Sequence, residues 1–88
     1  MTVLIDKSFD KDILAISNSK LKAKLAELIE TMLAIERIND IKNIKKLKGD
    51  SISYRIRIGD YRIGLECEDK CIKLIRFLHR KEIYKYFP

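Results

Sequence analysis

The chain has few of the residues on which metal-binding and cofactor-binding sites usually depend. Its two cysteines, Cys67 and Cys71, are too few for a disulfide framework and are no evident pair across a turn. One histidine beside a Cys-x₃-Cys spacing does not make a zinc site. The three glycines are scattered and form no phosphate-binding loop. No Ser/His/Asp order suggests a triad. The sequence therefore predicts neither a metal nor a cofactor.

Long apolar runs are also absent. No stretch approaches the roughly 18 uninterrupted apolar residues that a membrane-spanning helix needs, so we expect no membrane contact. Residues 1–6 have neither a basic region nor a small-residue cleavage site, which argues against a signal peptide. With so few cysteines, we expect a reduced, cytoplasmic protein. A chain of 88 residues is long enough for one hydrophobic core, so we predict a single domain over residues 1–88.

Positive charge is concentrated in the second half of the chain. Residues 1–44 hold 7 basic and 7 acidic residues, whereas residues 45–88 hold 12 basic and 6 acidic residues. The whole net charge of +6 therefore belongs to the second half. Such an asymmetry favours a polyanionic partner, with nucleic acid first and an acidic protein second.

The first half has the pattern of a short strand followed by two helices. Residues 2–5 form a β-type run, and Ser8 is expected to cap a helix that reaches Ile16. Residues 17–19 then interrupt the helical pattern. The second helix has an apolar face spaced by four, three, four and three residues, which is typical of a core-facing helix: Leu21, Leu25, Leu28, Met32 and Ile35.

The second half changes to the period of β-strands. Residues 38–49 fit either a helical continuation or a turn-rich connector, and then apolar and polar residues alternate over 52–58 and 61–67. A more apolar strand over 71–78 and a short tail helix over 80–87 follow. The predicted class is α+β, in the order β-α-α-β-β-β, with an antiparallel sheet packed on an N-terminal α-hairpin and a short C-terminal helix.

A two-residue loop at Gly59-Asp60 would fix the register of the first hairpin. Arg57 then lies opposite Arg62, and Arg55 lies opposite Gly64, on the face away from the apolar side chains. Like charges facing each other across a ladder are destabilising, so stability does not favour this arrangement. We expect a hollow above the glycine with three guanidiniums on its floor, which suits phosphate.

Two residues of the third strand have alternative predictions. With a two-residue turn at Asp69-Lys70, Glu66 opposes Lys73 and Phe77 opposes Arg62, where its ring could stack on a base. An equally plausible register places Phe77 in the core. Arg76 lies either at a sheet edge or beside an acidic partner.

The end of the chain offers one histidine and two tyrosines. The imidazole of His79 suits proton transfer near neutral pH, although a lone histidine at a strand end is more often structural. The hydroxyl of Tyr84 or Tyr86 could reach the basic face. Alternatively, Tyr84 anchors the tail helix together with Ile83 and Phe87.

Three blocks of this sequence together resemble the RelE/ParE toxin superfamily. They read KLKG at residues 46–49, YRIRIGDYRIG at residues 54–64 and LHRKEIY at residues 78–84. Each block alone is weakly specific, but the set, its spacing and the order of elements cover essentially the whole chain. The resemblance implies a RelE-like fold and the function of a toxin from a type II toxin–antitoxin module.

RelE-like toxins are ribosome-dependent mRNA endonucleases that cut in the A site without a metal. The 2′-hydroxyl of the substrate attacks the adjacent phosphate and leaves a cyclic phosphate and a free 5′-hydroxyl. The resemblance implies four partners: the ribosome, mRNA, a RelB-like antitoxin and, through the toxin–antitoxin complex, operator DNA.

The resemblance also implies roles for individual residues. Arg55 and Arg57 match the positions that activate the 2′-hydroxyl and stabilise charge, and Arg62 matches the phosphate-binding arginine. Arg80 matches the residue on the leaving-group side, and Tyr84 matches the tyrosine that stacks on or orients the base. Further RNA-binding residues are expected nearby: Lys46, Lys48, Phe77, Lys81 and Tyr86, the last as the fallback for Tyr84.

The chain departs from relatives that have lysines at the two basic strand positions. Because a guanidinium is a poor proton acceptor, Arg55 and Arg57 would stabilise the phosphate while His79 or a water moves the proton. Two alternative functions remain open at this point. One is a ParE-like inhibitor of DNA gyrase, and the other is a nucleic-acid-binding module without catalysis.

Overall fold

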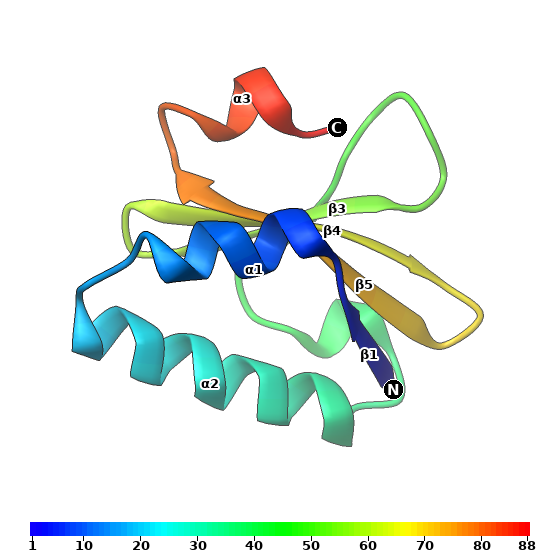
Figure 1. The fold of residues 1–88 in the computed structure, drawn as a ribbon. Helices are drawn as coiled ribbons and strands as arrows, with labels where there is room; N and C mark the ends of the chain where they lie inside the picture. The colour runs from blue at the N-terminus through cyan, green and yellow to red at the C-terminus, as the bar shows by residue number, and fades with distance from the viewer.

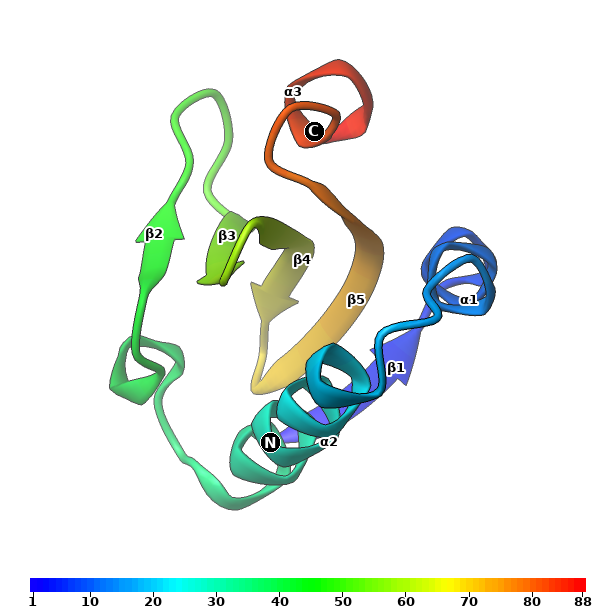
Figure 2. The ribbon, with the colours of Figure 1, turned by 90° about the vertical axis from the view of Figure 1, so that its left-hand side faces the viewer.

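The alternating apolar and polar residues of the second half build most of a five-stranded sheet. A computed structural model describes residues 1–88 (Figure 1). Its five strands lie in the order β1-β5-β4-β3-β2 (Figure 2). Its elements, with one 3₁₀ turn (η1), are β1 (Thr2–Ile5), α1 (Lys7–Leu14), α2 (Ser19–Ala34), η1 (Ile38–Asp40), β2 (Ile44–Lys46), β3 (Ser53–Ile58), β4 (Tyr61–Glu68), β5 (Cys71–His79) and α3 (Ile83–Tyr86).

The predicted α+β class is confirmed, but the sheet is mixed rather than wholly antiparallel. Strands β2, β3, β4 and β5 are antiparallel neighbours, but β1 pairs parallel with β5 at one edge. Parallel pairing requires a long crossover, and here α1, α2 and the other strands lie between the two partners in the chain. No helix is both long and apolar enough to cross a membrane.

The segment 38–49 is a connector rather than a helical continuation, and it contains a strand that the sequence analysis missed. In this strand, β2, Ile44 pairs with Ile56 and Lys45 pairs with Arg55. The spacing of three between isoleucines arises from η1 and the turn at Asn43, which has a φ of 62°. Because β2 has only three residues, it is too short to show alternation.

The cap of the first helix is Asp6 and not Ser8, so the predicted cap was wrong. The Asp6 carboxylate accepts hydrogen bonds from the Ser8 backbone nitrogen at 3.0 Å and from the Ser8 hydroxyl at 2.6 Å. Both bonds favour the ionised form and lower the pKa of Asp6. Helix α2 begins after Asn18, whose side chain accepts from the Leu21 nitrogen at 3.1 Å.

The two faces of the sheet carry hydrophobic cores of very different size. Helices α1 and α2 enclose the main core with the apolar face of the sheet, and 13 residues are buried in it. Helix α3 lies on the opposite side of the sheet from α2 (Figure 2). We call the sheet face that carries α3 the far face. Its small core contains three buried residues: Leu47, Ile83 and Phe87. A four-residue helix has no stability of its own, so these contacts hold α3 in place.

Candidate nucleic-acid interface

The predicted register of the β3–β4 hairpin is confirmed. Arg57 lies opposite Arg62, and Arg55 lies opposite Gly64. The two-residue loop depends on Gly59, whose φ of 62° favours glycine. Side chains alternate between the faces of a strand, and Ile56 and Ile63 between these positions are buried in the main core. The three arginines therefore share the far face.

The predicted hollow above Gly64 is not there, because the C-terminal segment fills it. A Cβ atom on Gly64 would overlap the ring of Phe87, so only glycine leaves room for this ring. Gly64 and Phe87 are both buried. The glycine thus serves to seat the end of the chain on the sheet, and basic side chains lie around this apolar contact.

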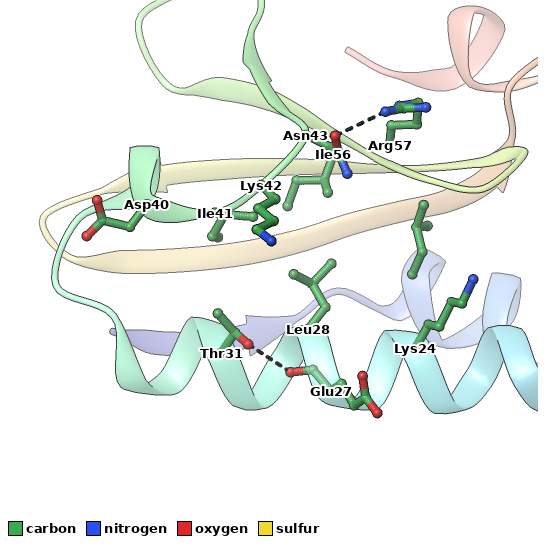
Figure 3. Close-up of a pocket in the computed structure, with 11 residues that line it drawn as sticks. Lys24, Glu27, Leu28, Thr31, Asp40, Ile41, Lys42, Asn43, Ile56 and Arg57 are labelled. Atoms are coloured by element: carbon green, nitrogen blue, oxygen red, sulfur yellow. Dashed lines mark hydrogen bonds between the residues drawn. The ribbon is translucent and has the colours of Figure 1, made fainter.

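The three guanidiniums do not converge, because each is held by a different neighbour. Arg57 donates from Nη2 to the Asn43 side-chain oxygen at 3.1 Å (Figure 3). Arg62 donates from Nη1 to two carbonyls of the turn, those of Gly59 and Tyr61, each at 2.9 Å. Arg55 lies over the ring of Tyr84, with Cζ 4.5 Å from the ring centroid. This separation relieves the repulsion expected from like charges on facing strands.

Two basic hollows lie beside Tyr84. One, of about 390 Å³, is lined by Arg62, Arg80, Lys81 and Tyr84. The other, of about 470 Å³, is lined by eight residues, again including Tyr84: Lys45, Lys46, Leu47, Lys48, Arg55, Tyr84, Phe87 and Pro88. The Tyr84 side chain is 72% exposed, so its ring stands between the hollows with a free surface.

The charged side chains that line these hollows are all basic. Neither is lined by an acidic side chain, and the carboxylate of Asp60 approaches Arg80 only to 3.9 Å at an exposed position. Arg62 uses Nη1 for the turn and keeps the N–H groups of Nε and Nη2 for other acceptors. Guanidinium and ammonium groups on both sides of an aromatic ring can bind successive phosphates while a base stacks on the ring.

Lys45 is a residue of this surface that the sequence analysis did not single out. It lies opposite Arg55 in the β2–β3 ladder and lines the larger hollow. The only signal in the sequence is Ile44 followed by two lysines, which is too short to reveal a strand.

Arg57 lies outside both hollows. It lines a separate groove of about 390 Å³ between α2 and the β2–β3 side of the sheet (Figure 3). The rim of this groove is mixed in charge, because Lys24 and Lys42 are accompanied by Glu27 and Asp40. The groove is therefore less suited to phosphate than the hollows at Tyr84.

Of the two placements predicted for Phe77, the one in the core is confirmed and the one that stacks it on a base was wrong. Glu66 does oppose Lys73, but a register shift at Gly64/Leu65 then pairs Phe77 with Ile63 instead of Arg62. Phe77 is 1% exposed, and its ring packs on Tyr61 and Phe9 at centroid distances of 5.2 and 6.0 Å.

His79 and Tyr86 also lie apart from the two hollows. His79 is opposite Tyr61 at the end of β5, with ring centroids 5.6 Å apart, and its Nδ1 accepts from the Lys81 nitrogen at 3.2 Å. Tyr86 lies under the guanidinium of Arg76, 5.0 Å from Cζ to the ring centroid. The prediction that Ile83 and Phe87 anchor α3 is confirmed. Tyr84, which was predicted to join them, is exposed and lies outside this small core.

Comparison with known proteins decides the family. Residues 3–84 match the family model described as ParE toxin of type II toxin-antitoxin system, parDE. Toxin RelE3 of Methanocaldococcus jannaschii is 43% identical over 89 residues, which cover 100% of both chains. The chain belongs to the RelE/ParE family of type II toxins. Putative toxin RelE1 of the same organism is 38% identical to this toxin, over 91% of this chain and 89% of that protein.

Solved structures agree with the predicted RelE-like fold of this toxin. The RelB-RelE antitoxin–toxin complex from Methanococcus jannaschii matches with a TM-score of 0.83 and 39% identity, covering 97% of this chain and 99% of that one. The archaeal RelE-RelB complex from Pyrococcus horikoshii OT3 matches with a TM-score of 0.74 and 24% identity, covering 90% and 93%. The second match supports the fold alone.

Proposed function

We propose that this toxin is a metal-independent endoribonuclease that cuts mRNA in the ribosomal A site and so inhibits translation. The observation that carries the proposal is the exposed ring of Tyr84 between two hollows lined by basic side chains. RNA strands offer this combination of spaced phosphates and stackable bases. Family membership supports the same chemistry.

The reaction requires charge stabilisation more than a metal. The 2′-oxygen bonds to the adjacent phosphorus, and the bond from phosphorus to the 5′-oxygen breaks, which leaves a cyclic phosphate and a 5′-hydroxyl. The proton lost by the 2′-hydroxyl goes to water, and the departing 5′-oxygen gains one from water. We assign this exchange to water because arginines hold their protons and His79 lies beside Tyr61, outside the hollows.

We assign charge stabilisation and phosphate binding to different basic side chains. Arg55 stabilises charge on the attacking side, Arg62 binds the phosphate through its free Nε and Nη2, and Arg80 lies on the leaving-group side. Tyr84 stacks on the base. Arg57 attracts RNA from outside the hollows, and three lysines bind neighbouring phosphates: Lys46, Lys48 and Lys81.

A RelB-type antitoxin is the proposed protein partner in the cytoplasm. The relatives in the Methanococcus jannaschii and Pyrococcus horikoshii structures are bound to RelB. Operator DNA would be contacted indirectly, through the toxin–antitoxin complex.

Cell-free translation tests the proposal. Purified toxin is added to a translation reaction, and mRNA 5′ ends are mapped by primer extension for the wild type, Arg55→Ala and Lys22→Ala. The last variant removes a positive charge from the exposed surface of α2 and serves as the matched control. We expect cuts only in translated message, weakened in Arg55→Ala and retained in Lys22→Ala. Intact message with normal translation would refute the nuclease.

The family model that matches is described as ParE, which favours a gyrase inhibitor as the second candidate. A DNA supercoiling assay with purified gyrase separates the two, because inhibition there with intact mRNA would support the ParE-like function. Salt-sensitive RNA binding without cleavage would instead indicate a non-catalytic module.

A further inference from the structure

Arg76 differs from the three arginines of the β3–β4 hairpin, because an acid neutralises it. Its Nε and Nη2 donate to the two carboxylate oxygens of Asp12 in α1, at 2.8 and 3.0 Å. The side chains are 23% and 9% exposed. Arg55, Arg57 and Arg62 have no ion pair. A paired, half-buried guanidinium is poorly suited to bind RNA, so Arg76 has another role.

The Asp12 carboxylate fixes Arg76 in one orientation. Besides the paired bonds to the guanidinium, its Oδ2 accepts from the Phe77 backbone nitrogen at 2.8 Å. Three bonds thus tie α1 to two consecutive residues of β5. The two-pronged geometry holds the plane of the guanidinium as well as its position.

The other side of Arg76 faces α3. Its Cζ lies 5.0 Å from the ring centroid of Tyr86, the last residue of that helix. Tyr84, two residues earlier in α3, is the ring under Arg55. The four residues of α3 cannot hold their own geometry, so contacts at Tyr86 influence where Tyr84 lies.

The register shift in β5 places Arg76 for this contact. The shift at Gly64/Leu65 leaves Ile75 as an extra residue and pairs Arg76 with Gly64. Gly64 is the residue on which Phe87 sits. Bulges often re-aim a side chain next to a functional site, and this one brings Arg76 beside the C-terminal segment.

We propose that Arg76 is a positioning residue for the Tyr84 site. Asp12 holds its guanidinium, the guanidinium holds the ring of Tyr86, and α3 thereby keeps Tyr84 over Arg55 between the two basic hollows. The consequence for RNA cleavage rests on the proposed function, whereas the position of Tyr84 can be measured without it.

Three variants test the proposal by two readouts. Arg76→Ala removes the guanidinium, and Tyr86→Leu removes the ring but leaves the Asp12–Arg76 pair intact. Lys73→Ala is the control, because it removes a charge from the same strand without a contact to α3. The first readout is the NMR chemical shift of the Arg55 side chain. The ring current of Tyr84 moves this chemical shift away from its usual value. The second is the cleavage rate on saturating ribosomes.

We expect Arg76→Ala and Tyr86→Leu each to abolish the ring-induced shift of Arg55 and to slow cleavage roughly tenfold or more, since small misplacements of a reacting group are costly. Lys73→Ala should retain both. Backbone amide shifts of β3 and β4 report whether each variant is folded. If Arg76→Ala were to unfold, Tyr86→Leu still tests the contact at an exposed position.

An Arg55 shift that persists in Tyr86→Leu would overturn the proposal, as would unchanged cleavage in a folded Arg76→Ala. A wild type that cuts no mRNA would refute the proposed function alone. In that case, loss of the Arg55 shift in both variants would still support the positioning role.

Discussion

The two faces of the sheet differ in how many apolar residues they bury and in how much charge they carry. The core between the sheet and helices α1 and α2 contains 13 buried residues, whereas the core between the far face and α3 contains three. The arginines of the far face are partly or fully exposed. Burial of apolar area supplies most of the stability, so the first face holds the fold together. The far face has little packing to lose and therefore tolerates facing arginines. We infer that stability and function are divided between the two faces.

The largest expected effect is a core truncation on the covered face. Leu65→Ala removes a fully buried side chain and should lower the free energy of unfolding by about 2–5 kcal/mol. Leu14→Ala is the matched control, because Leu14 is 84% exposed, and it should change stability by less than about 0.5 kcal/mol. Urea unfolding followed by circular dichroism measures both. Equal losses in the two variants would contradict the comparison.

The next effect separates two arginines that face each other on the far face. Arg62 lines a hollow beside Tyr84, whereas Arg57 lies in the groove near α2. Arg62→Ala should slow ribosome-dependent cleavage by roughly 100-fold, as loss of a charge-stabilising donor does. Arg57→Ala removes the same charge and should cost less than about tenfold. A larger loss for Arg57→Ala would show that the catalytic side of the hairpin has been misassigned.

Gly64→Ala should lower both the stability of the protein and its cleavage rate. Its methyl group would displace the Phe87 ring, which costs about 1–3 kcal/mol of stability by overpacking. Because Phe87 anchors α3, cleavage should fall as well. Thermal unfolding and primer extension measure the two effects.

A double-mutant cycle identifies the cause. Gly64→Ala should add little to Phe87→Ala, since the ring that it would displace is already absent. Additive losses in the double variant would mean that Gly64 acts through something other than Phe87.

The smallest effect concerns acid stability of the loop beside the larger hollow. A hydrogen bond from the Ser53 hydroxyl at 2.8 Å, and further bonds from the backbone nitrogens of Ser53 and Ile52, lower the pKa of Asp50 from its ordinary 3.8. Its stabilising contribution is therefore present above pH 3.8 and is lost as the pH falls through the lower folded value.

Asp50→Asn removes this titration. The loss of stability between about pH 7 and about pH 3, measured as the shift of the urea midpoint, should be smaller in Asp50→Asn than in the wild type. An equal shift in both proteins would mean that these hydrogen bonds make no pH-dependent contribution.

The sequence predicts the covered face well because local rules determine it. The two-residue loop at Gly59-Asp60 fixes the β3–β4 register, and helical spacing identifies the buried side of α2. These features need only neighbouring residues, so a single sequence reveals them.

The far face is harder to predict because distant residues and one irregularity build it. Glu66 and Lys73 pair as expected, but the register shift at Gly64/Leu65 leaves Ile75 of β5 without a partner in β4. The side chain of Phe77 therefore points into the core. No periodicity predicts that the ring of Phe87 returns to occupy the space above Gly64. Nor does register alone tell where a long, flexible arginine side chain finds its hydrogen-bond partner.

The most direct test of the division between the faces is Tyr84→Ala, measured for stability and cleavage in the same preparation. Tyr84 is 72% exposed, so its removal should change the free energy of unfolding by less than about 0.5 kcal/mol. We predict that cuts in translated mRNA disappear while the unfolding curve stays where it is. Undiminished cutting by a folded Tyr84→Ala would contradict the account.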